Sequence, residues 1–241
     1  MAAAIGHRIG RVNVIDVAWG VMFVAAAIVA AILGTASSSR RWIILGIVAV
    51  WGLRLSIYLA LKTAGHGEDP RYERILRKGD GSFLYTVRKV YLLQAFLAWF
   101  ISLPVQVAAI TDRPIGPLMW IGAVIAVVGI ALETVGDAQL SAFKSDPANK
   151  GKIMSSGLWS WTRHPNYFGD ACLWWGVFLI SAEAWPGALT ILSPVAMTYL
   201  LVFLSGAKLL ERSMSKRPGY NRYMRQTSFF VPLPPKKMKS G

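Results

Sequence analysis

Six long apolar stretches, each close to the length that crosses a lipid bilayer, dominate the chain. They cover residues 12–33, 42–61, 83–110, 117–140, 167–182 and 186–207. Because backbone groups in lipid must hydrogen-bond within their own segment, each run is expected to be a helix. The third run is long enough to overshoot the membrane or to bend at Pro104, and dividing it differently would raise the count to seven. The pattern predicts an all-α, polytopic membrane helical bundle with six or seven transmembrane helices, built as one integral membrane domain over residues 1–241.

Lysine and arginine gather on one side of this bundle if six helices alternate in direction. The segments before the first run, after the second and fourth runs, and after the last run hold 22 of the 26 cations, if Arg88 and Lys89 at the start of the third run are counted with the segment before it. The other side has Arg40, Arg41 and Arg113, and Arg54 lies within the second run. The positive-inside rule then makes the cation-rich side cytoplasmic and places both termini there.

Composition agrees with a membrane protein. The chain is 54% hydrophobic and only 16% charged, whereas soluble domains average about 45–50% and about 25%. A net charge of +14 could face nucleic acid, anionic lipid headgroups or an anionic cofactor. Since the cations segregate to one side of a membrane bundle, nucleic acid is not an expected partner.

The sequence predicts no disulfide, no metal site and no cleaved signal peptide. Cys172 is the single cysteine, so neither an intrachain disulfide nor a Cys-rich zinc site can form. A metal site made of histidines would need His7, His66 and His164 together, and no metal is expected. The first apolar run is about as long as a full span and carries Asn13 and Asp16, which does not fit a cleaved signal peptide.

Several polar residues fall within the predicted spans, where they are costly. Asn13 and Asp16 share one face of the first helix, Arg54 precedes Tyr58 by about one turn in the second, and the fourth and fifth carry Glu133, Asp137 and Asp170. They could pair as links between helices, for example Asp16 with Arg54. They could instead line a polar cavity open to the cytoplasm, and their clustering near the basic side favours this second interpretation.

The densest polar segment is 157–170, which includes RHPNYFG at residues 163–169 directly before the fifth run. Pro165 suits the first turn of a helix, and Asn166 could bond the exposed backbone there, where anions also bind. Arg163 and His164 would lie beside this helix start. The alternative is an interfacial anchor, since tryptophan, tyrosine and arginine all favour headgroup depth.

Two basic segments flank this region. Lys144, Lys150 and Lys152 could grip a phosphate-bearing ligand or could simply set topology. Residues 208–223 interleave cations with Tyr220 and Tyr223, a pattern that after a span favours contact with the membrane surface or closure over a ligand.

These segments together resemble a known family. The stretch 157–170 is similar to the C-terminal domain of steroid 5-alpha-reductase-type membrane enzymes, and above all to their bacterial branch, described as the DUF1295 family. The motifs that support it are NxxDxxW at 13–19, EDxRY at 68–72, DxQxxxFK at 137–144, YxxY at 220–223 and TSxFxP at 227–232. The resemblance covers nearly the whole chain in order, and it implies a multi-pass protein of the bacterial inner (cell) membrane.

The resemblance implies a membrane-embedded oxidoreductase that binds NADPH from the cytoplasmic side, in a C-terminal half of about residues 130–232. Its reaction would reduce a carbon–carbon double bond conjugated to a carbonyl, in a lipid or sterol-like substrate. Cations would hold the cofactor phosphates. The residues that the resemblance and the surrounding segment assign to the cofactor are Asp137, Lys144, Lys152, Arg163, His164, Asn166, Tyr167, Arg212 and Lys216.

The catalytic acid departs from the family pattern. The steroid enzymes polarise the substrate ketone with a tyrosine and a glutamate, but Trp51 stands where the tyrosine is expected. The candidates for the hydrogen-bonding acid are therefore Tyr58, Asp16 and Tyr72. The candidates for lining the substrate cavity are Asn13, Arg54, Glu133 and Asp170.

Two other functions stay open. A methyltransferase of the isoprenylcysteine carboxyl type would bind S-adenosylmethionine through the same Arg163–Pro165 region, but this cofactor has no phosphates for the basic residues to bind. A transporter or membrane scaffold would need the basic loops only for topology, and would leave the polar cluster from Asp137 to Asp170 without a purpose.

Overall fold

The structure is a computed structural model that describes residues 2–65, 67–77, 82–204 and 206–236. In these ranges the regular structure is helical, apart from one isolated parallel bridge between Thr162 and Ser228. His66 and three of the cations counted above, Lys78, Lys237 and Lys239, lie outside the described residues. The expected all-α class is confirmed.

The chain forms two compact units, which are described separately. Unit 1 comprises residues 1–115 and 184–190, and unit 2 comprises residues 116–183 and 191–241. The expectation of one integral membrane domain stays a prediction. The helices of unit 1 are α1 (Ala2–Ile9), α2 (Val14–Leu33), α3 (Ser38–Thr63), α4 (Pro70–Arg77), α5 (Phe83–Thr86), the π-helix η1 (Val87–Tyr91), α6 (Leu92–Ile101) and α7 (Leu103–Ile110).

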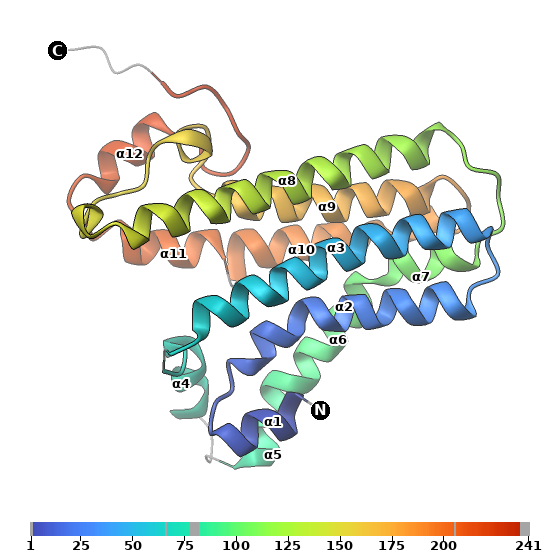
Figure 1. Cartoon of the computed structure of the whole chain (residues 1–241), viewed down its shortest axis with the longest axis horizontal. Helices are drawn as coiled ribbons and strands as arrows, with labels where there is room; N and C mark the ends of the chain where they lie inside the picture. The colour runs from blue at the N-terminus through green and yellow to red at the C-terminus, as the bar shows by residue number, and fades with distance from the viewer. Residues whose placement is uncertain (1, 66, 78–81, 205, 237–241) are drawn as a thin grey trace. The chain divides into compact units, whose positions relative to one another are not determined.

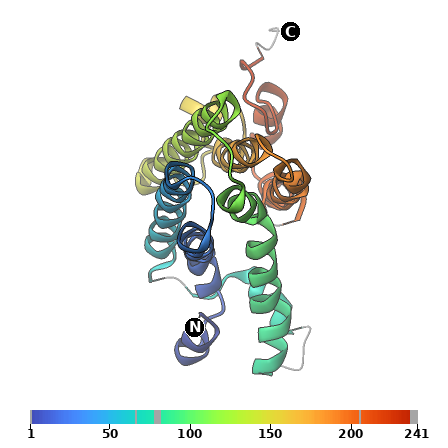
Figure 2. The ribbon, with the colours of Figure 1, turned by 90° about the vertical axis from the view of Figure 1, so that its right-hand side faces the viewer.

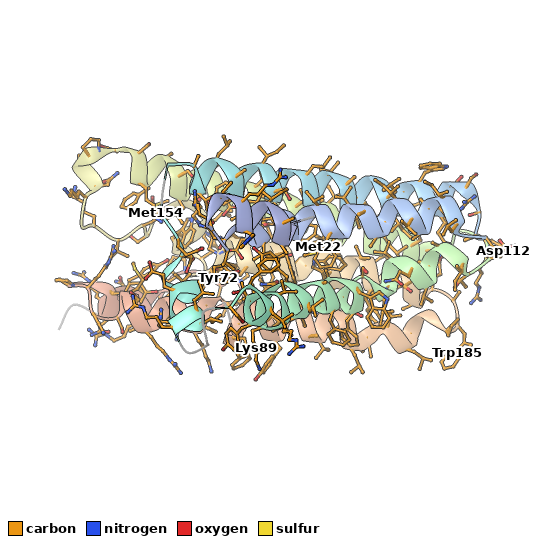
Figure 3. All side chains as sticks on the ribbon, turned by 90° about the horizontal axis from the view of Figure 1, so that it is seen from below. Met22, Tyr72, Lys89, Asp112, Met154 and Trp185 are labelled. Atoms are coloured by element: carbon orange, nitrogen blue, oxygen red, sulfur yellow. The ribbon has the colours of Figure 1, made fainter. Side chains whose placement is uncertain are left out.

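Unit 1 is organised around the antiparallel pair α2 and α3 (Figure 1). The two helices touch where Gly20 faces Gly52, and a Cβ added at Gly20 would lie 2.1 Å from the Gly52 carbonyl oxygen. Small residues let helix backbones approach this closely in a membrane protein. Asp112 and Trp185 lie at one end of this unit, and Tyr72 and Lys89 lie toward the other (Figure 3).

The third apolar run bends, as expected. The helix breaks at Ser102, and the segments Phe83–Ile101 and Leu103–Ile110 meet at 42°. Pro104 cannot donate a backbone hydrogen bond and clashes with the preceding turn. The Gln106 side chain donates to the Trp99 carbonyl at 3.1 Å, which satisfies a backbone acceptor near the break.

Two arginines of the cation-poor segments are used inside unit 1. Arg40 is fully buried and donates to the carbonyls of Arg113 and Pro114 at 3.3 and 3.2 Å. Arg41 donates to the Ala31 carbonyl at 2.6 Å, in the last turn of α2. Since backbone carbonyls accept from both side chains, these cations contribute to the turn structure as well as to the charge count.

Unit 2 is built on α8 (Pro117–Ser145), α9 (Pro165–Ala182) and α10 (Leu192–Tyr199). It continues through the π-helix η5 (Leu200–Leu204), α11 (Ala207–Met214) and α12 (Tyr220–Gln226), with short 3₁₀ turns at η2 (Pro147–Asn149) and η3 (Gly157–Ser160). Viewed nearly along the helices, α9 lies between α8 and α10 (Figure 2).

Glycines seven residues apart set the packing of α8 on α9. A Cβ added at Gly129 would lie 2.5 Å from the Gly169 carbonyl oxygen, and one at Gly122 would lie 2.5 Å from that of Gly176. A repeat of seven keeps the same helix face toward its neighbour over several turns. This close contact buries α9 and leaves the outer valines of α8, such as Val124 and Val128, exposed.

Fewer helices qualify as candidate membrane spans than the six or seven that the sequence predicted. Among the described residues, four helical segments are long and apolar enough to cross a membrane: 14–33, 38–63, 117–145 and 187–214; the bent pair over 83–110 would be a fifth. The run at 167–182 is a helix, but the first turns of α9 carry Asn166 and Asp170 and lower its apolar character. These helices are compatible with an integral membrane protein, while six or seven spans and the direction of the termini are not confirmed.

Candidate functional site

The start of α9 is the polar centre of unit 2. The Asn166 side-chain amide donates to Asp137 Oδ1 of α8 at 3.0 Å. Asp137 is buried, and Glu133 and Asp170 are buried about one turn deeper on the same two helices. A carboxylate close to the first turn of a helix is stabilised by the helix dipole. The α8–α9 contact therefore brings together four of the predicted polar residues.

Arg163 holds three segments together just before α9. Its guanidinium donates to the carbonyls of Met224 and Thr227, at the end of α12, at 2.8 and 3.3 Å. Its Nε also lies 2.6 Å from Oε1 of Glu211 on α11. Arginine suits this task because its planar fork serves several acceptors at once. In the structure, Arg163, which was predicted as a cofactor contact, links the start of α9 to α11 and α12 by hydrogen bonds and an ion pair.

His164 is buried next to Arg163 and also contacts Glu211. Its Nε2 lies 3.4 Å from Oε1 of Glu211, and its ring stacks on Tyr167 with centroids 5.7 Å apart and meets Phe229 edge-on at 5.6 Å. A carboxylate that accepts from one imidazole nitrogen fixes the orientation of the ring. His164 is therefore held in one orientation at residues 163–167, the segment that begins α9, which we call the α9 entrance.

Residues 220–236, which we call the C-terminal hook, fold back over residues 159–163. The Tyr223 hydroxyl donates to the Trp159 carbonyl at 2.5 Å, the Arg163 backbone N–H to Ser228 at 2.9 Å, and the Leu233 N–H to Trp161 at 3.0 Å. Burial, and secondarily the charge of Glu211, raises the pKa of Tyr220 to about 12. Burial likewise raises the pKa of Tyr223, so both hydroxyls stay protonated donors at neutral pH.

Four predicted cofactor cations are exposed at the same end of unit 2. Lys144 lies in the last turn of α8, Lys152 in the loop that follows, Arg212 on α11 and Lys216 just after it. In Figure 1 the end of α8, the loop after it, α11 and α12 gather at one end of this unit. We call these four residues the basic rim. Their contact with a phosphate stays a prediction.

The candidate catalytic residues belong to unit 1. The Tyr72 hydroxyl donates to Asp16 Oδ1 at 2.5 Å, and Tyr72 is buried in an apolar cluster with Ile15 and Val90. Tyr72 and Met22, labelled in Figure 3, belong to this cluster. The structure thus pairs two of the three predicted acids.

Tyr58 has a different environment in the same unit. It lies half-buried on α3 with the Lys62 ammonium 5.4 Å from its ring centroid. Arg54 is half-buried one turn earlier on that helix, and Asn13 is buried at the start of α2. The predicted substrate-cavity residues are thus divided between the units, two in each, and the cavity stays a prediction.

One finding on sequence relatives decides the family. A family model with the description "Protein of unknown function (DUF1295)" matches residues 2–227. The chain belongs to the DUF1295 family. The resemblance inferred from the motifs is confirmed at this level.

Two known proteins are similar in sequence to this DUF1295 chain. An uncharacterized protein of Schizosaccharomyces pombe is 24% identical over 228 residues, which cover 83% of this chain and 66% of that protein. A probable O-methyltransferase of Ustilaginoidea virens is 32% identical over 105 residues, which cover 43% of this chain and 35% of that protein. The chain spans less than two thirds of the length of either relative. No solved structure matches it significantly.

Two important residues of this DUF1295 chain were not assigned from its sequence. Glu211 is the only acidic residue after Glu183, so its position amid cations could have marked it. Glu68, within EDxRY, accepts from the backbone N–H groups of Val12 and Asn13 at the start of α2. The described residues contain no group of three or more histidine, cysteine or acidic side chains that could hold a metal ion.

Proposed function

We propose that this DUF1295 protein is a membrane-embedded oxidoreductase that uses NADPH to reduce an activated carbon–carbon double bond in a lipid-like substrate. The observation that carries the proposal is the α9 entrance: a rigid polar cluster next to an exposed basic rim. Bound NADPH would supply a hydride, and the protein's residues bind, orient and exclude water.

The residues fit a phosphate-bearing cofactor. The basic rim offers four cations. Of the carboxylates in this part of unit 2, Glu133, Asp137 and Asp170 are buried and Glu211 is paired with Arg163. The exposed Asp146 accepts from the Ala148 backbone N–H and from the Asn149 side chain. The end of unit 2 therefore presents a positive surface, and lysine and arginine are the side chains that recognise phosphate. Asn166 and Asp137 form the polar pair at its inner edge.

The rigid part of the site supports orientation rather than phosphate binding. Arg163 already serves Glu211 and the carbonyls of Met224 and Thr227, so we remove it from the proposed phosphate contacts. His164 is held by Glu211 and by stacking on Tyr167. In our proposal these residues shape the entrance, and the basic rim carries the charge recognition.

A second candidate is a methyltransferase that uses S-adenosylmethionine. The observation that favours it is the 105-residue similarity to a probable O-methyltransferase. This cofactor lacks phosphates, so the basic rim would have no phosphate to bind. The two candidates therefore differ in whether the basic rim binds a phosphate.

A thermal-shift titration distinguishes them. The full-length protein in detergent is titrated with NADPH, NADH and S-adenosylmethionine. Stabilisation by NADPH supports the reductase, stabilisation by S-adenosylmethionine alone supports the methyltransferase, and no response to any of them favours a non-enzymatic membrane protein. Lys144→Ala and Asn166→Ala are expected to weaken NADPH binding while the protein stays folded. Lys89→Ala, which removes an exposed cation of unit 1, is the matched control.

The proton donor is the second part of the proposal. Reduction adds a hydride to one carbon and a proton to its neighbour, and general-acid catalysis typically contributes about 10²–10⁴-fold. Tyr72→Phe keeps the ring in its cluster but removes the proton shared with Asp16, so turnover of an enone lipid should fall with NADPH binding unchanged. Tyr58→Phe is the matched comparison: if it alone lowers turnover, Tyr58 is the acid.

A further inference from the structure

An apolar pocket of about 220 Å³ lies in unit 2, beside the C-terminal hook. It is lined by Leu132, Leu158, Trp161, Thr162, Pro165, Phe168 and Pro232. The hydroxyl of Thr162, the lone polar side chain apart from the Trp161 indole, donates to the Phe230 carbonyl at 2.8 Å. The pocket therefore has no free hydroxyl for a polar ligand and suits a hydrocarbon chain.

Exposed apolar side chains neighbour the pocket on a candidate membrane span. Leu132 belongs to α8, one of the candidate membrane spans, and its neighbours Val128 and Val135 are exposed. Trp161 is 48% exposed at the pocket wall. Tryptophan favours headgroup depth in membranes. These features favour a lipid acyl chain as the apolar group that would fill this pocket.

Cations gather next to the same wall. The chain leaves the pocket at Pro232 and returns to α12, where the Lys236 N–H donates to the Gln226 carbonyl at 2.9 Å. This bond places Lys236 next to α12, which carries the exposed residues Arg222 and Arg225. The tyrosines of α12, Tyr220 and Tyr223, are buried on its other side. Four residues of extended chain span at most about 14 Å, so the cations lie within reach of the pocket.

Nothing acidic in this part of the sequence balances the three cations. Glu211 is the single acidic side chain after Glu183, and it is taken up by Arg163 and His164. Long basic side chains can extend toward the headgroup layer while their stems lie on apolar surface. An apolar pocket beside an uncompensated positive cluster fits one kind of molecule, an anionic amphiphile.

We propose that the C-terminal hook forms an anionic phospholipid site, with one acyl chain in the pocket of Trp161 and Phe168 and the phosphate at Arg222, Arg225 and Lys236. The site uses none of the four basic-rim residues and does not depend on the proposed reductase activity. Residues from three distant parts of the chain form it, and the hook is the element that joins them.

The test compares three probes on the full-length protein in detergent at low salt. They are a short-chain phosphatidylglycerol, a phosphatidylcholine with the same chains, and glycerol phosphate, which has no chains. We expect thermal stabilisation and saturable binding with phosphatidylglycerol, a much weaker effect with phosphatidylcholine, and none with glycerol phosphate. Equal effects of the first two probes, or binding of glycerol phosphate with similar affinity, would overturn the proposal.

Variants locate the site. Arg222→Gln with Arg225→Gln should weaken phosphatidylglycerol binding by about 30-fold, from roughly fivefold for each cation near a headgroup. Arg88→Gln with Lys89→Gln, which removes two exposed cations from η1 of unit 1, is the matched control and should have no effect. Equal binding by the two double variants would contradict the assignment.

Fluorescence reports the pocket independently. Phosphatidylglycerol with brominated chains should quench part of the tryptophan emission, and Trp161→Phe should remove that part. Because Trp161 is half exposed and keeps an aromatic ring in this variant, folding is expected to survive. Quenching that is unchanged in Trp161→Phe would show that the chain binds elsewhere.

Discussion

At the scale of single residues, buried charge is the feature that organises unit 2. Arg163 and Glu211 lie 48 positions apart, and their ion pair ties the entrance of α9 to α11. A buried charge that loses its partner is costly, so each member of such a pair depends on the other. The sequence showed Arg163 as a candidate ligand contact, and the structure shows that its guanidinium already has its acceptors.

Arg163→Lys should therefore destabilise the protein although it keeps the charge. An ammonium group cannot reproduce the forked contacts to Glu211, Met224 and Thr227, and we expect a loss of about 2 kcal/mol of unfolding free energy. Thermal unfolding in detergent measures the loss of stability. Limited proteolysis measures whether residues 215–220, the segment before α12, become more accessible. Wild-type behaviour in both would show that Arg163 does not fasten the hook. Arg217→Lys, at an exposed position, is the control.

The raised tyrosine pKa values predict loss of stability in alkali. The pKa of Tyr220 rises from an ordinary 10.0 to about 12 in the folded state, so the folded protein holds this proton more tightly. The resulting stabilisation is complete below about pH 10 and is lost as the pH rises toward 12. Tyr223→Phe should lower the free energy of unfolding by about 1 kcal/mol at neutral pH, because it loses the hydrogen bond to the Trp159 carbonyl. The free energy of unfolding of this variant should also fall less steeply between about pH 10 and pH 12. An identical pH dependence of unfolding in Tyr223→Phe and wild type would contradict this.

At the scale of elements, the helix starts are stabilised by side chains from distant parts of the chain. Glu68 caps α2, Glu183 accepts from the Met119 N–H in the first turn of α8 at 3.0 Å, and Asp137 holds Asn166 in the first turn of α9. Negative charge at a helix start is favourable because of the free N–H groups and the helix dipole. Capping is usually local, so these three carboxylates carried no capping signal in the sequence.

Close packing of α8 on α9 gives the third prediction. Gly129→Ala would place a Cβ 2.5 Å from the Gly169 carbonyl oxygen, and relieving that contact should cost about 1–3 kcal/mol. Gly46→Ala is the matched control, because it lies within α3 and its Cβ would meet nothing within 4 Å. The control should be neutral or stabilising by up to about 1 kcal/mol, since alanine favours helix. Equal unfolding temperatures for the two variants would contradict the proposed contact.

At the scale of the whole molecule, the all-helical class predicted from the sequence is confirmed, whereas the six or seven predicted spans are not. The apolar runs became helices because lipid leaves backbone groups no other partner, and the bend at Pro104 followed from its missing N–H. The run at 167–182 did form a helix, yet its close packing on α8 depends on glycine contacts that periodicity does not reveal. For the candidate site, the motifs located the α9 entrance, whereas Glu211 became visible only through its contacts.

Charge segregation makes a prediction about orientation. Asp112 and Lys152 flank α8, so a membrane-impermeant maleimide should reach them from opposite sides. Because Cys172 is the single cysteine, Cys172→Ser gives a clean background for Asp112→Cys and Lys152→Cys. Labelling of Lys152→Cys only after the cytoplasmic side is opened would confirm the predicted orientation. Labelling of both positions from one side would show that α8 does not cross the membrane.

The sequence by itself determined the all-helical class, the cation-rich segments and the family, because these depend on local composition and on motifs that stand in order along the chain. The tertiary structure decided which of the candidate residues have partners. Arg163 meets Glu211 and the end of α12, Tyr72 meets Asp16, and Lys236 returns to Gln226. These contacts join residues that are 10 to 64 positions apart in the chain, and only packing of the helices brings such groups to hydrogen-bonding distance.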